Sequence, residues 1–278
     1  MPKMRRVAAA QMKFRSTVGE NVAHIVATIH SVALSRADVV LFPECAVTGY
    51  HCDFNLIRPA EIESALATIG GAARAAGCHV LVGSPTFAGR KRYNSLVVFD
   101  RHGREVFCYS KIHLTARDKR SFSPGNKLAL FELDGISCTA MICHERRFPE
   151  LVRLPVMLGA QIIFHPNAGL DSLTVSRAKR RGRDGIATRA FENAVYYVFA
   201  NSVGSQGAGL WSAGDSKIVA PNSTVIALAD NRREMTIQAP LDWSLATRQY
   251  AREALVRPAF LRRHWKAMLA GCRKQLRS

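Results

Sequence analysis

An apolar run, Ile136 to Ile142, ends at a cysteine, Cys143, and a charged segment of helical character follows at once. A strand that ends in this way delivers one side chain to the rim of a sheet, where loops and helix N-termini gather ligands. The backbone N–H groups at a helix start carry partial positive charge, which favours a thiolate over a thiol. We therefore expect Cys143 to be a nucleophile. A lone cysteine is more often a small buried residue. Whether Cys143 is catalytic therefore depends on a base and a cation elsewhere in the chain.

Length and composition permit one large domain. The chain has 278 residues, and 48% of them are hydrophobic, which is enough to bury a sizeable core. The sequence contains no linker, internal repeat or low-complexity segment. We expect one domain over residues 1–278, whose last part, about 243–278, is a basic helical tail.

Cysteine usage and hydropathy indicate the compartment. The seven cysteines show no CxxC spacing and several lie in apolar, strand-like runs, which indicates a reducing environment rather than a disulfide framework. No apolar run approaches the ~20 residues that a membrane span requires. The apolar stretch at the start of the chain is cut short by Gln11, so we expect no signal peptide. These features predict a cytoplasmic protein without membrane contact.

The formal net charge is +18, from 39 lysine and arginine against 21 aspartate and glutamate residues. The excess is concentrated in the run Arg177 to Arg183 and in the tail from Arg248 to Arg277. Such a balance raises a nucleic-acid hypothesis. However, no RNA-recognition, zinc-finger or helix-turn-helix pattern accompanies it, and aromatic residues are not interleaved as base stacking requires. We expect a solvated basic surface, with attraction of anionic substrates as the second interpretation, and no nucleic-acid partner.

Apolar periodicity predicts strands that alternate with helices early and late in the chain, with hairpins between them. Asp134-Gly135 is a preferred hairpin dipeptide, and His102-Gly103 is a second turn signal. This order is typical of a mixed-sheet α/β domain. The expected strands are 6–11, 38–42, 79–83, 93–100, 105–109, 128–133, 136–142, 161–165, 194–200, 217–220, 224–229 and 234–238, and the expected helices are 21–34, 60–76, 149–158, 186–193 and most of 243–276, with a break at Pro258.

Three predicted strands end in reactive side chains, namely Glu44, Lys111 and Cys143. One sheet edge could gather all three. A carboxylate in a dry pocket can serve a cysteine nucleophile as its base. A lysine and the backbone N–H after the cysteine can stabilise an oxyanion. Each residue alone is more often structural or solvated, and only the combination indicates catalysis.

The chain resembles the nitrilase (carbon–nitrogen hydrolase) superfamily along most of its length. Six or more short motifs occur in the order of that family, which makes the resemblance specific although each motif alone is weak. The principal motifs are similar to Leu41-Phe-Pro-Glu44 with Thr48-Gly-Tyr50, Tyr109-Ser-Lys111-Ile-His-Leu114 and Ile142-Cys143-His-Glu-Arg-Arg-Phe-Pro-Glu150, and the supporting ones to Tyr93-Asn-Ser95, Phe122-Ser-Pro-Gly125, Arg189-Ala-Phe-Glu-Asn193 with Ala200-Asn201, and Gly214-Asp-Ser216 with Val219-Ala-Pro221.

The resemblance implies a four-layer αββα sandwich with mixed sheets, paired into a homodimer or a higher homo-oligomer. It also implies the catalytic roles: Cys143 attacks an amide or nitrile carbon, Lys111 stabilises the developing charge, and Glu44 moves protons. Ammonia or an amine leaves, and water then hydrolyses the thioester. No cofactor and no metal are expected. His144-Glu145 begins like a HExxH zinc motif, but Phe148 stands where the second histidine would be.

Two positions depart from the family pattern. Asp118 stands where many members have a second glutamate, four residues before Phe122, and is one methylene shorter. It is either a positioning carboxylate or an exposed loop charge. After the cysteine, amidase members commonly have Tyr-Asp, whereas this chain has His144 and Glu145. Glu145 retains an acidic side chain at the position of the aspartate. His144 either alters the pocket wall or only packs against neighbouring residues.

Further residues are candidates for substrate binding. We assign Tyr50, His144, His165 and Asn167 to this group. His165 follows a strand at the presumed edge, where it lines the pocket or, alternatively, is a hydrogen-bonded structural histidine. Arginines of the run 177–183 could grip a substrate carboxylate at the pocket mouth.

Three hypotheses on function follow. The leading one is a hydrolase of a small linear amide or N-carbamoyl compound. In one form of this hypothesis the substrate is anionic. The second is a nitrilase, whose members usually have longer C-terminal extensions than this chain shows. The third, from another class, is a catalytically silent basic binding protein on the same fold. Intact Glu44, Lys111 and Cys143 speak against the third hypothesis.

Overall fold

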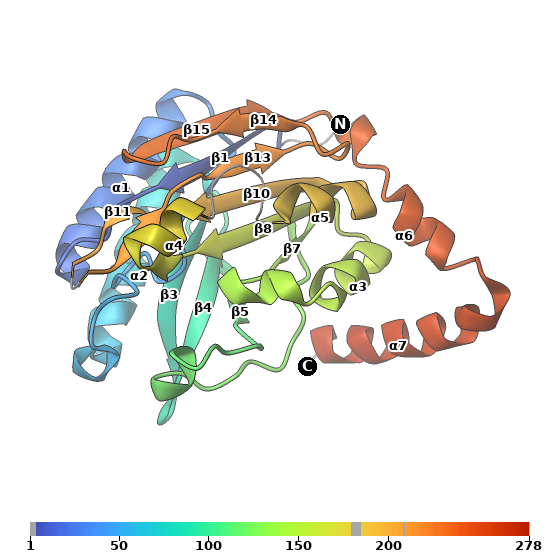
Figure 1. The fold of residues 1–278 in the computed structure, drawn as a ribbon, viewed down its shortest axis with the longest axis horizontal. Helices are drawn as coiled ribbons and strands as arrows, with labels where there is room; N and C mark the ends of the chain where they lie inside the picture. The colour runs from blue at the N-terminus through green and yellow to red at the C-terminus, as the bar shows by residue number, and fades with distance from the viewer. Residues whose placement is uncertain (1–3, 179–184, 208, 278) are drawn as a thin grey trace.

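Two six-stranded sheets stack face to face, and helices cover the outer face of each sheet (Figure 1). This arrangement is taken from a computed structural model that describes residues 4–178, 185–207 and 209–277. The four-layer αββα sandwich with mixed sheets that the sequence predicts is confirmed.

The first sheet has the strand order β15-β1-β2-β3-β4-β5. Strands β1, β2 and β3 run parallel, and the remaining pairs are antiparallel. The sequence predicted its strands but ended β3 at Gly83, whereas β3 continues to Ala88 and forms a long hairpin with β4. The strands are β1 (Arg6–Gln11), β2 (Val39–Leu41), β3 (His79–Ala88), β4 (Lys91–Phe99), β5 (Glu105–Ser110) and β15 (Met235–Pro240).

The second sheet has the order β14-β13-β10-β8-β7-β6, with β7, β8 and β10 parallel. A third, small sheet of order β11-β12-β9 lies at its carboxyl edge and was not predicted, because its strands have two or three residues each. The strands are β6 (Phe131–Leu133), β7 (Ile136–Ala140), β8 (Ile162–Asn167), β9 (Leu170–Asp171), β10 (Tyr196–Asn201), β11 (Val203–Ser205), β12 (Trp211–Ala213), β13 (Lys217–Val219) and β14 (Val225–Leu228).

Two long helices, α1 (Val18–Leu34) and α2 (Pro59–Ala76), cover the first sheet. Helix α1 begins three residues before the predicted start, because Thr17 and Glu20 form a capping box that satisfies two backbone N–H groups. The second sheet is covered by α3 (Glu150–Leu158), α5 (Ile186–Asn193), α6 (Gln249–Ala254) and α7 (Ala259–Arg277), and the short α4 (Leu173–Ala178) packs beside β12.

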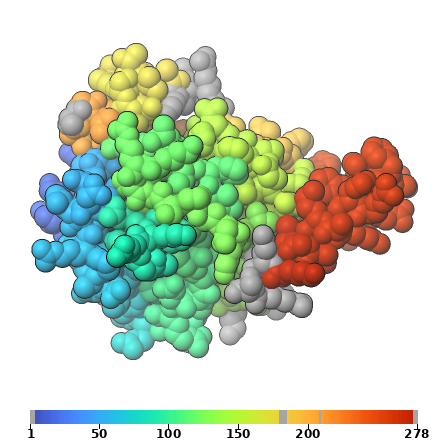
Figure 2. Space-filling view, turned by 90° about the horizontal axis from the view of Figure 1, so that it is seen from below, coloured from blue at the N-terminus to red at the C-terminus, as the bar shows by residue number. Residues whose placement is uncertain are grey.

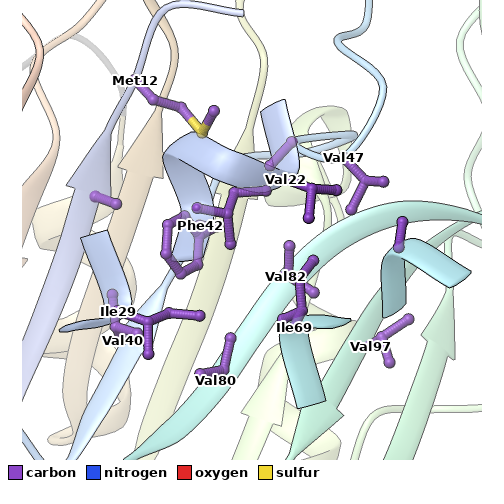
Figure 3. Close-up of a cluster of buried hydrophobic side chains, with 14 of the residues drawn as sticks. Met12, Val22, Ile29, Val40, Phe42, Val47, Ile69, Val80, Val82 and Val97 are labelled. Atoms are coloured by element: carbon purple, nitrogen blue, oxygen red, sulfur yellow. The ribbon is translucent and has the colours of Figure 1, made fainter. Parts of the chain in front are cut away.

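Strand alternation divides the core between three layers. In β1, Val7 and Ala9 face the second sheet, whereas Ala8 and Ala10 face the helices. Figure 3 shows part of the cluster between the first sheet and α1 and α2. Each fully buried aliphatic side chain of this kind contributes about 1.5–3 kcal/mol through the hydrophobic effect. The layers therefore hold both sheets, and the loops at their edges, in a fixed relation.

The C-terminal helices form a projecting end of the molecule (Figure 2). Helix α7 begins directly after Pro258, where the sequence predicted a break. Leu269 and Cys272 are buried against the cluster that contains α3, and Trp265 packs beside them. Seven basic residues of these helices and of the turn between them are exposed, namely Arg252, Arg257, Arg262, Arg263, Lys266, Arg273 and Lys274. Within the described part of the chain, no helix is long and apolar enough to cross a membrane.

Candidate active site

Cys143 follows β7 and opens a short 3-10 helix, Cys143–Arg147. Its φ is 53°, in the left-handed region that non-glycine residues seldom adopt, so the chain turns sharply at this residue. The half-buried thiol lines a cavity. The Cys143 carbonyl accepts a hydrogen bond of 3.0 Å from the imidazole Nε2 of His165, which lies in β8. Strained backbone that a neighbouring side chain holds in place is typical of a functional position.

Glu44 follows β2 and is fully buried. Its Oε1 accepts hydrogen bonds from the Lys111 ammonium, at 2.7 Å, and from the Asn94 amide, at 2.8 Å. Its Oε2 accepts a bond of 3.1 Å from the backbone N–H of Ala168. The carboxylate is thus fixed from three sides, and a lone pair of Oε2 remains to take a proton.

Lys111 follows β5 and is also fully buried. Its Nζ lies 2.7 Å from Glu44 Oε1 and 2.9 Å from Asp118 Oδ2. Burial acts to lower the pKa of Lys111, but the negative charges of Glu44 and Asp118 outweigh it and hold the pKa well above its usual value. Lys111 is therefore a permanent cation at the centre of the site.

Asp118 is 1% exposed and belongs to the same cluster, so the alternative of an exposed loop charge is wrong. Its Oδ1 accepts a hydrogen bond of 2.5 Å from the Tyr50 hydroxyl. Its Oδ2 accepts bonds from the backbone N–H and the hydroxyl of Thr115, at 2.9 and 2.8 Å. Burial alone would raise the pKa of Asp118, but the Lys111 charge and these hydrogen bonds lower it. The loop folds inward because Asp118 supplies the second carboxylate for a buried cation.

The catalytic candidates come from two sheets, and the expectation of a single sheet edge is wrong. Glu44 and Lys111 leave the first sheet, whereas Cys143 leaves the second. The sandwich brings the carboxyl ends of β2 and β5 opposite the carboxyl ends of β7 and β8. The bond from Ala168, after β8, to Glu44 joins the two sheets directly. Sequence reasoning could not divide the strands between sheets, since both sets are equally apolar.

The charge state of the thiol also differs from the expectation. Burial, the Glu44 carboxylate and a hydrogen bond to that carboxylate raise the pKa of Cys143 to about 12, although Lys111 acts in the opposite direction. This shift favours a resting thiol and runs against the expected preference for thiolate. Desolvation by the surrounding protein outweighs the few N–H groups at the start of a five-residue helix. A nucleophile of this kind needs a base at the moment of attack, and Glu44 is the carboxylate in place.

A cavity of about 330 Å³ opens above these groups. Since liquid water occupies ~30 Å³ per molecule, it has room for a ligand of roughly ten non-hydrogen atoms. Among the described residues, no carboxylate pairs with the three arginines of its wall. The cavity is lined by Glu44, Tyr50, Thr115, Arg117, Cys143, His144, Arg146, Arg147, Asn167, Gly169, Leu170, Asp171, Phe199, Asn201, Ala213, Gly214 and Asp215.

Three of the four substrate-binding candidates, Tyr50, His144 and Asn167, line this cavity. His165 does not: it is fully buried beneath Cys143, and its Nδ1 lies 2.9 Å from the Tyr197 hydroxyl. Of the two interpretations left open for His165, the geometry fits the structural one. Burial, and next the positive charge of Arg147, lower the pKa of His144.

A chain of amides forms one wall of the cavity. Asn201 donates a hydrogen bond of 2.7 Å to the Gly214 carbonyl, and Asn167 donates one of 2.8 Å to Asn201 Oδ1. Because a carbonyl can only accept, the orientation of both amides is fixed. Gly169 packs against this pair, and a Cβ there would stand 2.9 Å from Asn167 Nδ2.

Sequence reasoning missed several residues of the site. Asn94 lies in the matched motif Tyr93-Asn-Ser95 but was given no role, and Thr115 was not singled out. Arg146 and Arg147 stand in the cysteine motif and were not proposed as cavity residues. Of the basic run that was proposed, Arg177 is exposed at the end of α4, and residues 179–183 lie outside the described residues.

The fold and the cluster of Cys143, Glu44 and Lys111 are typical of a carbon–nitrogen hydrolase. The chain belongs to the carbon-nitrogen hydrolase family, whose sequence profile matches residues 6–251. The resemblance stated from the motifs is thus confirmed.

Individual relatives support the same assignment. A protein of Pyrococcus abyssi named nitrilase is 31% identical over 220 residues, which cover 77% of this chain and 80% of that one. A 2-oxoglutaramate amidase of Bacillus subtilis is 30% identical over 217 residues, covering 74% of this chain and 79% of that one. Among solved structures, an amidase of Nesterenkonia sp. AN1 superposes with a TM-score of 0.80 at 25% identity, over 94% of this chain and 99% of that one.

Proposed function

We propose that this chain hydrolyses the C–N bond of a small linear amide or N-carbamoyl compound that carries a carboxylate, through a thioester on Cys143. One observation carries the proposal: the Cys143 thiol and the Glu44 carboxylate line one cavity, and Glu44 accepts a hydrogen bond of 2.7 Å from Lys111. The cation is fully buried and pairs with this base.

In the first half-reaction, Cys143 Sγ attacks the carbonyl carbon while Glu44 takes the thiol proton. Two of the three N–H bonds of Lys111 are directed to Glu44 and Asp118, so the third is left for the substrate oxygen. The backbone N–H of His144 is the second donor for that oxyanion. Glu44 then gives its proton to the nitrogen, the C–N bond breaks, and ammonia or an amine leaves a thioester behind.

In the second half-reaction, water attacks the thioester carbon and Glu44 accepts its proton. The C–S bond breaks, the sulfur is reprotonated, and a carboxylic acid leaves. The sum is amide plus water to acid plus ammonia or amine. The raised pKa of Cys143 makes the sulfur a good proton acceptor at the end of this step, so the enzyme returns to its resting thiol.

The arginines support an anionic substrate. Arg146 is half-buried, and Arg117 and Arg147 are exposed at the cavity wall. Asp215, on the opposite side, already pairs with Lys217 at 2.8 Å. A guanidinium without a carboxylate partner binds a substrate carboxylate in two parallel hydrogen bonds. The relative named 2-oxoglutaramate amidase is named for an amide that bears a carboxylate.

Ammonia release from four compounds tests the proposal: succinamate, its neutral analogue butyramide, N-carbamoyl-β-alanine, and 3-cyanopropanoate as the matching nitrile. Wild type and Cys143→Ala are compared. We expect Cys143-dependent release from one or both of the carboxylate-bearing amide and carbamoyl compounds, with kcat/KM at least about tenfold above butyramide. Release from the nitrile alone would replace the amidase by a nitrilase. Release that persists in Cys143→Ala would contradict the mechanism.

A further inference from the structure

Lys111 and Cys143 must face the same substrate carbon, yet they leave different sheets. Their separation therefore depends on how the two sheets are joined at this edge. Rigid placement of reacting groups matters because a displacement of ~1 Å can cost about a hundredfold in rate. Hydrogen bonds join the loop after Lys111 to the turn at Cys143.

Glu145 makes these contacts. It is fully buried, two residues after the cysteine, and lies outside the cavity wall. Its Oε1 accepts hydrogen bonds from the backbone N–H groups of Ile112, at 2.7 Å, and His113, at 3.1 Å. Its Oε2 accepts one of 2.7 Å from the backbone N–H of Ile142. The Tyr109 hydroxyl lies 2.9 Å from both oxygens.

The donors flank the two reacting residues in the sequence. Ile112 and His113 come directly after Lys111, whereas Ile142 comes directly before Cys143. One carboxylate thus joins the backbone beside the cation to the backbone beside the nucleophile, across the boundary between the sheets. Hydrogen bonds to a charged acceptor are short and about twice as strong as neutral ones.

We propose that Glu145 is a positioning residue that fixes the Lys111 ammonium and the Cys143 thiol relative to each other. The inference rests on the proposed function for its kinetic consequences only, since the thiol can also be followed by alkylation. Glu145 reaches no reacting atom. It acts through the two backbone segments that it joins.

The chemistry of the contacts requires two acceptor oxygens, as a carboxylate supplies. Both oxygens accept backbone N–H groups, so in Glu145→Gln one N–H of the new amide must face a backbone donor whichever way the amide turns. Tyr109→Phe, by contrast, removes a donor but leaves the three backbone bonds in place, and is a matched control for loss of one buried hydrogen bond.

The experiment compares Glu145→Gln with Tyr109→Phe and with Val98→Ala, which truncates a buried residue of the core between the sheets. All assays are run well below each melting temperature. For Glu145→Gln we expect kcat to fall about tenfold or more with KM nearly unchanged. For Tyr109→Phe and Val98→Ala we expect kcat within about threefold of wild type at comparable losses of melting temperature.

Alkylation of Cys143 by iodoacetamide gives a second readout that needs no substrate. Lys111 lowers the pKa of Cys143, so a displaced Lys111 slows alkylation at a given pH. Lys111→Met is the reference for complete loss of that charge. We expect Glu145→Gln to slow alkylation in the wild-type background and to add nothing in the Lys111→Met background.

Two outcomes would overturn the inference: a folded Glu145→Gln variant with wild-type kcat and alkylation rate, or equal slowing of alkylation with and without Lys111. If wild type hydrolyses none of the four compounds, the proposed function fails, whereas the alkylation cycle still decides whether Glu145 couples Lys111 to Cys143.

Discussion

Gly83, in β3, lies directly behind the backbone of Glu44: a Cβ at position 83 would stand 2.7 Å from the Glu44 Cα and 2.2 Å from the Pro43 carbonyl oxygen. No side chain fits at such distances. The chain after β2 approaches β3 this closely because residue 83 is glycine, and the Gly83 carbonyl accepts a bond of 3.2 Å from the Val47 N–H. The glycine therefore determines where the catalytic carboxylate stands.

Gly83→Ala should displace Glu44 and lower turnover of the amide substrate by at least about tenfold, with a loss of about 1–3 kcal/mol in the free energy of unfolding from overpacking. Gly71→Ala is the matched control, since a Cβ there meets nothing within 4 Å and lies within α2. That variant should gain up to about 1 kcal/mol. Urea unfolding and ammonia release measure both effects. Wild-type turnover in Gly83→Ala would show that the loop relaxes freely.

Lys111→Met should both abolish turnover and destabilise the fold. It leaves the buried carboxylates of Glu44 and Asp118 without their cation. Removing one partner of a buried pair costs about 3–5 kcal/mol. Adding Asp118→Asn should recover part of the stability, but none of the turnover, because one of the two uncompensated charges is removed. Chemical unfolding of the single and double variants tests this. A double variant less stable than Lys111→Met would contradict the electrostatic account.

Asp118→Asn should weaken acylation and also flatten the acid limb of the stability curve. The pKa of Asp118 is lowered in the folded state, so its ionised form stabilises the fold above the unfolded pKa of about 3.9, and this contribution is lost as pH falls through the folded pKa. As pH falls through that window, the free energy of unfolding should decrease less steeply in the variant than in wild type. The two slopes should differ by up to about 1.4 kcal/mol per pH unit. Glu63→Gln, at an exposed position, is the control. Parallel curves for Asp118→Asn and wild type would exclude the linkage.

The raised pKa of Cys143 predicts an unusual alkylation profile. With a pKa of about 12, the iodoacetamide rate should keep rising with pH to about 10, without a plateau. Glu44→Gln removes a negative charge that raises this pKa, so its alkylation should be faster at a given pH although its turnover is lost. A plateau near neutral pH in wild type would mean that the resting group is already a thiolate.

Arg146→Gln and Arg147→Gln should raise KM for a carboxylate-bearing amide by about tenfold or more, with little change in kcat, because they remove binding common to ground and transition states. KM for butyramide should not change. Arg153→Gln is a control from the neighbouring helix α3, outside the cavity. Equal changes in KM for the charged and the neutral amide would show that the two arginines do not bind the substrate carboxylate.

Local pattern alone predicted much of the fold. Strand β1 and helix α5 have the predicted bounds, because β1 is a continuous apolar run buried on both faces and the buried residues of α5 recur with the period of a helix. The extension of β3 to Ala88 was missed, since its last residues are partly exposed and are stabilised by pairing with β4. The short strands of the third sheet were missed because two or three residues show no period.

The sequence by itself determined the fold class and placed Glu44, Lys111 and Cys143 at strand ends, since these features depend on neighbouring residues in the chain. Only the tertiary structure decided that the three come from two facing sheets and that Asp118 is buried beside Lys111. It also decided that burial raises the pKa of the Cys143 thiol and that Glu145 joins the turn at Cys143 to the loop after Lys111. Desolvation and contacts between distant segments set these properties, and neither can be read from local pattern.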